Sequence, residues 1–350
     1  MKICIIGGVA GGATAAARLR RLDESLEILM FERGDYISFA NCGLPYHISG
    51  RIKERDSLLL QTPEGFWSRF RVEVRLGSQV LAIDPQHKRL QVRNLKDARE
   101  YEEPYDYLIL SPGAYPFVPP IEDGGGETCM SLRDIPDMDA IMSRIDRERV
   151  REAVVVGGGF IGVEIAENLI ARGIETHMVE MLDQVMAPFD REMAGIIEAG
   201  LVGGGVRLHL SDRVKRIVGG PPRRVILESG KELAAGLVIS AVGVRPDIQL
   251  ARTAGLKIGD AGGIAVDAGM RTSDPYIYAV GDAVETTHLV AGTQVLVPLA
   301  GPANKQARVA ADNICGLSSR YPGSLGTSIV KVFALQAAAT GLNEKTARRN

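Results

Sequence analysis

The sequence has few cysteines, few aromatic residues and no surplus of charge of either sign. Its four cysteines, Cys4, Cys42, Cys129 and Cys315, contain no C-x-x-C pair and the five histidines are scattered, which excludes the spacing of a structural zinc site. A long chain with few, unpaired cysteines is typical of a reducing compartment, where one of them can serve as a working thiol. We therefore expect a cytoplasmic protein without a bound metal.

Charge and hydropathy exclude two further classes of protein. Lys and Arg number 41 against 43 Asp and Glu, a net charge of −2, so the overall charge favours neither nucleic acid nor an anionic membrane as a partner. The sequence contains no apolar run of about 18 residues, the length that a membrane-spanning helix needs. We expect a protein that binds neither nucleic acid nor membrane.

Glycine, in contrast, is abundant. The 350 residues include 40 glycines, which is typical of a chain with many tight turns and phosphate-binding loops. The length favours two or three domains, because single hydrophobic cores rarely grow so large.

A strand, a glycine turn, a helix and a second strand are predicted at the start of the chain. The mainly apolar residues 2–6 precede GGVAGG at residues 7–12, a helix-like stretch and an apolar run that ends at Glu32. Glycines let backbone N–H groups approach a pyrophosphate at the positive end of a helix, and an acid after the second strand accepts hydrogen bonds from a ribose. Val9 replaces the middle glycine of G-x-G-x-x-G, so we expect the pyrophosphate to approach this loop differently.

The same order of elements returns later in the chain. It begins at Ala153, its glycines Gly157, Gly159 and Gly162 satisfy G-x-G-x-x-G, and its second apolar run ends at Glu180. A single glycine loop also occurs in ordinary turns. Two loops that each follow a strand and each have an acid predict two nucleotide-binding units in an α/β fold with Rossmann-like, three-layer domains.

A third element indicates a flavin site. Residues 272–285, TSDPYIYAVGDAVE, end an apolar run with Gly281 and Asp282, which places a carboxylate at the carboxyl end of a strand, where α/β sheets bind ligands. A helix N-cap is the alternative role of Asp282. The segment resembles the element with which flavoproteins that have two dinucleotide sites bind the ribityl chain of FAD.

With these elements the sequence resembles the pyridine nucleotide-disulfide oxidoreductases over nearly its whole length. Residues 38–46, SFANCGLPY, are similar to the single-cysteine branch of that family, in particular to coenzyme A-disulfide reductases and NAD(P)H-dependent coenzyme A persulfide reductases. The resemblance implies FAD and NADH (or NADPH) as cofactors. It also implies a coenzyme A-type thiol, disulfide or persulfide as partner, and a homodimer for the full-length chain.

The resemblance also implies a set of site residues. For FAD these are Gly7, Gly8, Gly11, Gly12, Glu32, Arg33, Val80, Ser111, Gly113, Gly281, Asp282, Pro298, Leu299 and Ala300. For the nicotinamide nucleotide they are Gly157, Gly159, Ile161, Gly162, Glu164, Glu180 and Gly243. For coenzyme A they are Thr14, Arg18, Arg21, Ser38, Asn41 and Asn304. A solvated helix face is the alternative reading for the arginines, and a surface acid for Glu164.

Cys42 is the predicted catalytic residue, with Asn41 beside it. Asn41 is a good N-cap and an apolar segment follows as far as Ile48, so we expect Cys42 in the first turn of a helix, where the dipole lowers the pKa of a thiol. The alternative is a small buried hydrophobe. Two-cysteine relatives carry a C-x₄-C disulfide, whereas His47 stands here at the second position. A lone thiol stores oxidation as a mixed disulfide, a sulfenic acid or a persulfide.

The resemblance implies hydride transfer from NADH to FAD, followed by reduction of a disulfide between Cys42 and coenzyme A. NADH is favoured because no Arg adjoins Glu180 to accept a 2′-phosphate. Reduction of a coenzyme A persulfide is a second possibility. Oxidase or peroxidase chemistry through a Cys42 sulfenic acid is a third, although Ala10 stands where peroxidases have a histidine. A catalytically incomplete, flavin-binding redox fragment is the fourth.

The predicted domains follow the two glycine loops. We expect an FAD-binding domain split into residues 1–113 and 248–322, with an NAD-binding domain inserted over residues 114–247. Residues 323–350 resemble the truncated start of an α+β dimerisation domain, with an opening strand and a helix. The rest of that domain is missing from the sequence, so we expect a truncated chain.

Overall fold

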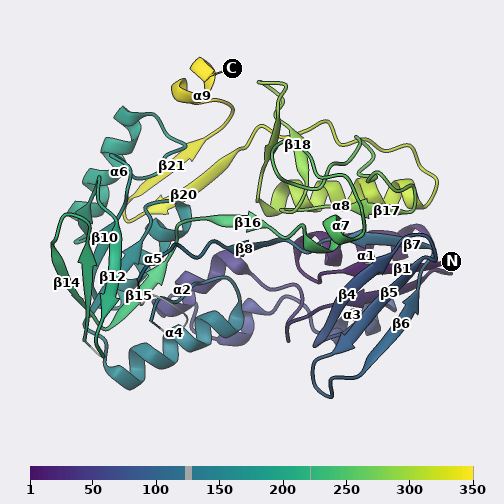
Figure 1. Ribbon diagram of the computed structural model, residues 1–350, viewed down its shortest axis with the longest axis horizontal. Helices are drawn as coiled ribbons and strands as arrows, with labels where there is room; N and C mark the ends of the chain where they lie inside the picture. The colour runs from purple at the N-terminus through teal and green to yellow at the C-terminus, as the bar shows by residue number, and fades with distance from the viewer. Residues whose placement is uncertain (123–127, 221, 350) are drawn as a thin grey trace. The chain divides into compact units, whose positions relative to one another are not determined.

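The computed structural model describes residues 1–122, 128–220 and 222–349, which divide into two compact α/β units (Figure 1). Unit 1 comprises residues 1–39, 59–115 and 245–325, and unit 2 comprises residues 40–58, 116–244 and 326–350. The α/β fold predicted from the sequence is confirmed. In the described ranges, no helix is both long and apolar enough to cross a membrane.

Unit 1 is built on a parallel sheet with the strand order β17-β7-β1-β2-β3. The strands are β1 (Lys2–Ile6), β2 (Glu27–Phe31), β3 (Glu73–Arg75), β7 (Tyr107–Leu110) and β17 (Ile277–Ala279). The chain runs from β1 outward to β2 and β3 and then returns to β7 and β17 on the other side. The order therefore reverses between β1 and β7, and ligands of α/β sheets bind beyond the carboxyl ends of strands at such a reversal.

The core of unit 1 surrounds this sheet. The strand residues predicted from apolar runs, such as Ile3, Ile5 and Leu29, are buried, because a parallel sheet covered on both faces needs nearly continuous apolar strands. Helix α1 (Ala10–Leu22) packs against α8 (Ala300–Ile314) (Figure 1). The remaining elements of unit 1 are α3 (Pro63–Phe70), α7 (Gln249–Thr253), the antiparallel sheet β4 (Ser78–Asp84), β5 (Arg89–Asn94) and β6 (Glu100–Pro104), and the pair β18 (Glu285–Thr287) and β19 (Gln294–Leu296).

Unit 2, like unit 1, is built on a parallel sheet whose strand order reverses. Its parallel sheet has the order β11-β10-β9-β15, which reverses between β9 and β15. The strands are β9 (Glu152–Val156), β10 (Glu175–Val179), β11 (Arg207–His209) and β15 (Leu237–Ser240), with helices α4 (Ile135–Glu148), α5 (Phe160–Ala171) and α6 (Arg191–Gly203). An antiparallel sheet is formed by β12 (Val214–Val218), β13 (Arg223–Leu227) and β14 (Glu232–Ala235). Strands β8 (Ala114–Pro116) and β16 (Val244–Pro246) pair where the chain passes from one unit to the other.

The segment around Cys42 groups with unit 2. It contains the 3₁₀ turns η1 (Asn41–Gly43) and η2 (Arg55–Leu58) and the short helix α2 (Leu44–Ile48), which contacts α4 and α5. The predicted boundaries had placed this segment in the domain of the first glycine loop. Sequence order alone did not indicate the contacts of α2 with α4 and α5.

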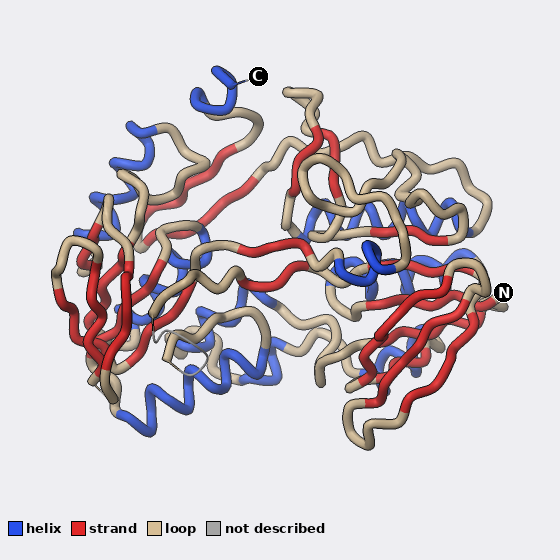
Figure 2. Tube along the Cα trace, in the orientation of Figure 1, coloured by secondary structure: helices blue, strands red, loops and turns tan. Residues whose placement is uncertain are grey.

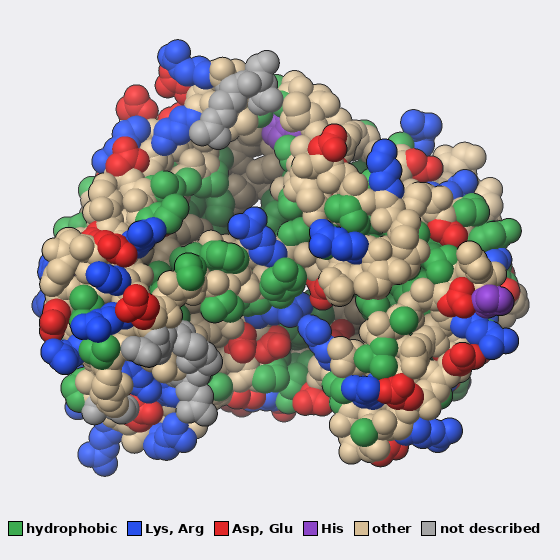
Figure 3. Space-filling model, in the orientation of Figure 1, with side chains coloured by type: hydrophobic (Ala, Val, Ile, Leu, Met, Phe, Trp, Pro, Cys, Tyr) green, Lys and Arg blue, Asp and Glu red, His purple; other side chains and the backbone are tan. Residues whose placement is uncertain are grey.

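The final residues form a hairpin and a helix. Strands β20 (Ser328–Val332) and β21 (Leu335–Ala339) pair antiparallel and α9 (Glu344–Arg349) follows, as Figure 2 shows. The sequence predicted one strand and a helix here. The hairpin belongs to unit 2 and packs against α5 and α6. On the face drawn in Figure 3, acidic and basic side chains are interspersed.

Candidate functional site

The first glycine loop follows β1 and is tied to the acid that ends β2. The backbone N–H of Gly8 donates to Oε2 of Glu32 at 2.8 Å, and the N–H of Gly34 donates to Oε1 at 2.8 Å. A methyl group on Gly12 would lie 1.9 Å from the carbonyl oxygen of Gly7, so only glycine allows α1 to approach the strand so closely. The loop therefore presents backbone N–H groups without side-chain cover, which fits a dinucleotide pyrophosphate.

Other predicted FAD residues lie at the carboxyl edge of the same sheet. Ser111 and Gly113 follow β7, and Gly281 and Asp282 lie just beyond β17. The N–H of Gly281 donates to Oε1 of Gln306 on α8 at 2.8 Å, and Pro298 to Ala300 lead into the start of α8. The fold thus brings segments that are far apart in sequence to the point where the strand order reverses. Two further predicted FAD residues lie elsewhere in unit 1. Arg33 follows Glu32 directly, and Val80 is buried in β4.

Residues predicted to contact coenzyme A in unit 1 have partners within the protein. The Thr14 hydroxyl donates to Oδ1 of Asn304 at 2.8 Å, which joins α1 to α8. Nε of Arg18 donates to Oδ1 of Asp312 at 2.7 Å, so an internal carboxylate already balances its charge. The guanidinium of Arg21 lies 5.6 Å from the centre of the Phe70 ring.

Ser38 lies against the first loop, because its N–H donates to the carbonyl oxygen of Gly8 at 2.9 Å. It has a φ of 45°, a left-handed conformation that is uncommon for residues other than glycine.

The second glycine loop repeats the first one in detail. The N–H of Gly158 donates to Oε2 of Glu180 at 2.6 Å, and the N–H of Leu182 donates to Oε1 at 2.9 Å. A methyl group on Gly162 would lie 2.0 Å from the carbonyl oxygen of Gly157. The glycine cradle and the fixed acid therefore fit a second dinucleotide, as predicted from the sequence. Sequence reasoning missed Gly158, although its correspondence to Gly8 would have identified it.

Val9 and Gly159 occupy the middle position of the G-x-G-x-x-G pattern in the two loops, and their backbone conformations show why valine is tolerated there. Gly159 has a φ of −79° and a Cβ added there would meet nothing within 4 Å. Val9, at the matching place, has a φ of −93°, so neither residue needs the conformational freedom of glycine. Ile161 is partly exposed on α5 and Gly243, with a φ of +109°, follows β15.

Cys42 lies in the 3₁₀ turn η1, and the expected N-cap is wrong. The Asn41 side chain caps no helix; its Nδ2 instead donates to the carbonyl oxygen of Arg133 at 3.3 Å. Cys42 is exposed on one side, so a substrate thiol or disulfide can reach its sulfur. The alternative of a buried hydrophobe does not apply to Cys42, whereas Cys4 is fully buried in β1 and burial raises the pKa of its thiol to about 12.

The ionisation of Cys42 also differs from the prediction. Burial of its remaining sides raises the pKa of the Cys42 thiol and the carboxylate of Glu164 raises it further, while a backbone hydrogen bond opposes them. The single 3₁₀ turn and the five-residue helix α2 are too short for a dipole that would overcome these effects. The prediction that the thiol pKa is lowered is therefore wrong, and the pKa is raised instead.

Glu164 is the second titratable group of this site. It lies on α5, and burial together with the neighbouring Glu167 raises its pKa to about 7. Burial and, after it, the charge of Glu164 also raise the pKa of Tyr46 on α2. A carboxyl group that titrates near neutral pH next to a thiol can hold a proton or release it at that sulfur. The described residues contain no group of three His, Cys, Asp or Glu that would hold a metal ion.

Comparison with known proteins relates these features to a family. The model of the family described as "Pyridine nucleotide-disulphide oxidoreductase" matches residues 1–307. Among curated proteins, a "NADH oxidase" of Methanocaldococcus jannaschii is 36% identical over 98% of this chain and 76% of its own length. A "NAD(P)H sulfur oxidoreductase (CoA-dependent)" of Pyrococcus abyssi is 37% identical over 99% of this chain and 76% of its own length.

Two solved structures are also similar to the chain. The first is a reduced Bacillus anthracis protein described as "CoADR-RHD", with a TM-score of 0.97 and 48% identity over 99% of this chain. The second is a "NAD-Dependent Persulfide Reductase from A. fulgidus", with a TM-score of 0.97 and 39% identity over 100% of this chain. The chain spans 63% and 65% of the lengths of these two proteins. From the family match over residues 1–307 and these identities, the chain belongs to the pyridine nucleotide-disulphide oxidoreductase family.

Proposed function

We propose that this chain uses NAD(P)H and FAD to reduce a disulfide or persulfide of coenzyme A through Cys42. The observation that carries the proposal is the exposed Cys42 thiol beside Glu164, within the SFANCGLPY segment of a chain that has two glycine cradles. The names of similar proteins support it, since they include a CoA-dependent NAD(P)H sulfur oxidoreductase and a persulfide reductase. A "Coenzyme A disulfide reductase" of Staphylococcus aureus, 33% identical over 97% of this chain and 77% of its own length, also supports it.

Cys42 would act as the nucleophile. Its thiolate attacks one sulfur of coenzyme A disulfide, a bond forms between Cys42 and that sulfur, and the second coenzyme A leaves as a thiolate. Attack on the inner sulfur of a coenzyme A persulfide gives the same mixed disulfide and releases hydrosulfide. Two electrons from NAD(P)H then return the mixed disulfide to the Cys42 thiolate and a coenzyme A thiol. FAD, when bound, supplies the two-electron relay between nicotinamide and sulfur.

The chain's other residues would bind and orient the reactants. Glu32 and Glu180 accept the ribose hydroxyls of the two dinucleotides, and the glycines of residues 7–12 and 157–162 hold their pyrophosphates. Asp282, just beyond the carboxyl end of β17, would accept a hydrogen bond from the flavin ribityl chain. Glu164 takes the proton of Cys42 and returns it to the leaving thiolate, because its pKa near 7 suits transfer in both directions.

An oxidase is the second candidate, because one similar protein is named "NADH oxidase". In that reaction two electrons from NADH reduce dioxygen to hydrogen peroxide, which oxidises the Cys42 thiolate to a sulfenic acid and leaves as hydroxide. Two further electrons from NADH then reduce the sulfenic acid to the thiolate and water. The two candidates differ in the group attached to the sulfur. Detection of a coenzyme A adduct on Cys42, as opposed to one added oxygen, separates them.

The test is intact-mass analysis after anaerobic mixing of the flavin-loaded protein with coenzyme A disulfide. We expect one coenzyme A adduct in the wild type, its loss on addition of NADH, and none in Cys42→Ser. Cys129→Ser is the matched control and should keep the adduct, since burial raises the pKa of the Cys129 thiol to about 11. An adduct that persists in Cys42→Ser, or NADH-driven thiol release that is unchanged in that variant, would remove Cys42 from the mechanism.

We further propose that the protein works in the cytoplasm and that the full-length chain is a homodimer. Four free cysteines support a reducing compartment. The homodimer rests on the resemblance to the family. Sedimentation of the full-length protein tests the dimer, and a monomer at micromolar concentration would contradict it.

A further inference from the structure

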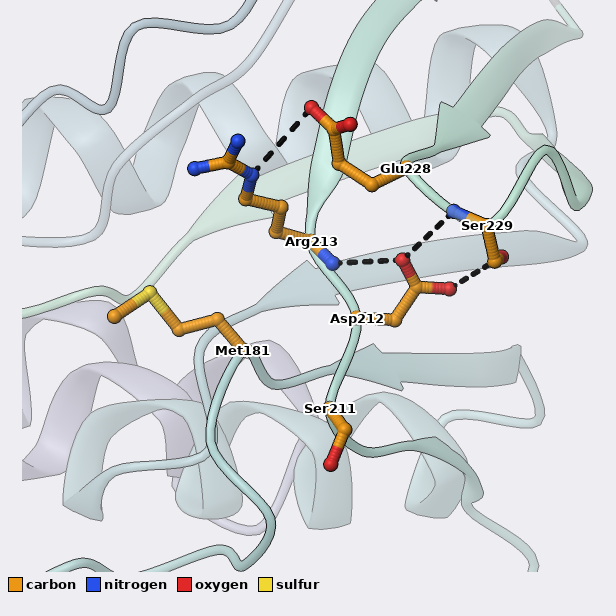
Figure 4. A pocket seen from close by; sticks show the side chains of 6 residues that line it. All are labelled: Met181, Ser211, Asp212, Arg213, Glu228 and Ser229. Atoms are coloured by element: carbon orange, nitrogen blue, oxygen red, sulfur yellow. Dashed lines mark hydrogen bonds and ion pairs between the residues drawn. The ribbon is translucent and has the colours of Figure 1, made fainter.

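A pocket lies beside the acid that ends β10. It has a volume of about 410 Å³ and is lined by Met181, Ser211, Asp212, Arg213, Glu228 and Ser229 (Figure 4). All of these residues belong to unit 2. They come from the turns after β10 and β11 and from the turn between β13 and β14, so the pocket opens at the carboxyl edge of the second parallel sheet.

Hydrogen bonds fix this pocket to Glu180. The N–H of Asp212 donates to the backbone carbonyl of Glu180 at 3.2 Å, and the N–H of Ser211 donates to that of Leu182 at 2.8 Å. The Glu180 carboxylate itself is held by Gly158 and Leu182. An acid at this place accepts the 2′-hydroxyl of the adenosine ribose in NAD sites, and a nearby Arg accommodates the 2′-phosphate in NADP sites.

Arg213 is the arginine that lines this pocket, and it lies 33 residues beyond Glu180, so the absence of an Arg directly next to Glu180 did not reveal it. Its guanidinium pairs with Glu228, with 3.4 Å between Nε and Oε1, while its side chain is 68% exposed. Figure 4 shows the side chains of Arg213 and Met181 extending toward the same side of the pocket. Arg213 therefore brings a positive charge to a pocket whose lining segments are hydrogen-bonded to the segment of Glu180.

Acidic groups outnumber Arg213 in this pocket. Asp212 accepts hydrogen bonds from the N–H and hydroxyl of Ser229, at 3.2 and 2.5 Å, and from the N–H of Arg213 at 2.9 Å. Although burial opposes them, these bonds hold the pKa of Asp212 below its ordinary value, so it is ionised at neutral pH. Glu228 already neutralises the Arg213 guanidinium. A 2′-phosphate, which adds a charge of about −2, would therefore be repelled.

We propose that the Arg213–Glu228 pair determines the choice between NADH and NADPH. With the pair intact the site favours NADH, and Arg213 becomes a phosphate-binding group only when Glu228 no longer neutralises it. The inference rests on the proposed use of NAD(P)H, but it concerns the adenosine end of the nucleotide and is independent of Cys42.

The test measures binding of AMP and of adenosine 2′,5′-bisphosphate by calorimetry, which needs neither flavin nor sulfur substrate. In Glu228→Gln we expect the affinity for the bisphosphate relative to AMP to rise about threefold to fivefold, the size of an exposed ion pair. In Arg213→Ala the same ratio should fall. The ratio of kcat/KM for NADPH and NADH should follow both changes in the flavin-loaded protein.

A matched pair provides the control. Arg224 and Glu232 lie 3.3 Å apart with 65% and 50% side-chain exposure, belong to the same unit and do not line the pocket. Glu232→Gln should leave both ratios unchanged. Ratios that stay within twofold of wild type in Glu228→Gln and in Arg213→Ala, in variants with a wild-type circular dichroism spectrum, would overturn the inference. If NADH fails to reduce the flavin while the binding ratios change as expected, the proposed function fails and the inference stands.

Discussion

At the scale of single residues, the ionisation of Cys42 depends on burial and on one charged neighbour from a distant part of the chain. Cys42 lies in η1 and Glu164 lies on α5, the short helix α2 contacts both elements, and burial raises the pKa of each group. The thiol is therefore less acidic than a helix N-terminus would make it. The reactivity of the thiol therefore depends on pH through its own ionisation and through the charge of the nearby Glu164 carboxyl, which titrates close to neutral pH.

The first prediction concerns Glu164→Gln. Ionised Glu164, present above about pH 7, raises the pKa of Cys42, so its removal should lower the thiol pKa and speed alkylation by iodoacetamide at pH 8. The measurement is the pH profile of Cys42 alkylation, followed by peptide mass analysis. Glu192→Gln, an exposed acid on α6, is the control and should leave the profile in place. A Glu164→Gln profile that coincides with wild type, or shifts to higher pH, would contradict the assigned coupling.

At the scale of elements, a buried carboxylate ties the β20–β21 hairpin to α5. The side chain of Glu167 is 1% exposed, pairs with Arg51 at 2.8 Å and Lys331 at 2.6 Å, and accepts the N–H of Phe333 at 3.0 Å. Although burial opposes them, the hydrogen bonds from these three residues hold the pKa of Glu167 below its ordinary value. The same carboxylate thus joins α5, the segment after α2 and the hairpin.

The second prediction follows from that lowered pKa. Because the folded-state pKa lies below the unfolded value of 4.5, the ion pairs stabilise the fold above about pH 4.5 and the stabilisation is lost as pH falls through the folded-state pKa. Glu167→Gln should reduce the free energy of unfolding by about 1–3 kcal/mol at pH 7, the cost of leaving charged hydrogen-bond partners unsatisfied. The difference from wild type should shrink toward pH 3, which urea unfolding at several pH values measures.

Glu232→Gln is the control for this stability series, since its exposed ion pair should contribute no more than about 1 kcal/mol. A loss in Glu167→Gln that stays constant from pH 7 to pH 3 would show that the side chain stabilises the fold by packing and not by charge.

At the scale of the whole molecule, the chain carries the same nucleotide cradle twice, one in each unit. The loops match in the acid that accepts a glycine N–H and in the glycine that allows close approach of helix and strand. Geometry within each loop therefore does not distinguish FAD from NAD(P)H. The assignment of FAD to unit 1 rests on residues outside the loop, above all Asp282 beyond β17.

The third prediction tests that assignment by hydrogen exchange. FAD added to flavin-free protein should slow exchange in peptides that cover residues 7–12 and 32–34, whereas NAD⁺ should slow exchange in those that cover residues 157–162 and 180–182. At a ligand concentration of about 100 times Kd the stabilisation is about 2.7 kcal/mol, which is well within reach of the method. Protection of residues 7–12 by NAD⁺ in place of FAD would reverse the assignment.

Local patterns in the sequence were enough to predict the strands and helices around both loops and the two acids that follow the second strands, whereas Cys42 was singled out by the resemblance of its segment to the family. Apolar runs and glycine spacing act within a few residues, so they can be read without knowing what packs against them. The resemblance of SFANCGLPY to one branch of the family added the chemistry.

The tertiary structure decided what depends on residues distant in sequence. It buried part of the Cys42 thiol and placed Glu164 near it, which together raise the thiol pKa. It also directed the Asn41 side chain to Arg133 instead of a helix end, and brought Arg213 beside the segment of Glu180. Ionisation and recognition depend on burial and on charges within a few ångströms. Such neighbours are set by the packing of whole elements, which no short sequence pattern specifies.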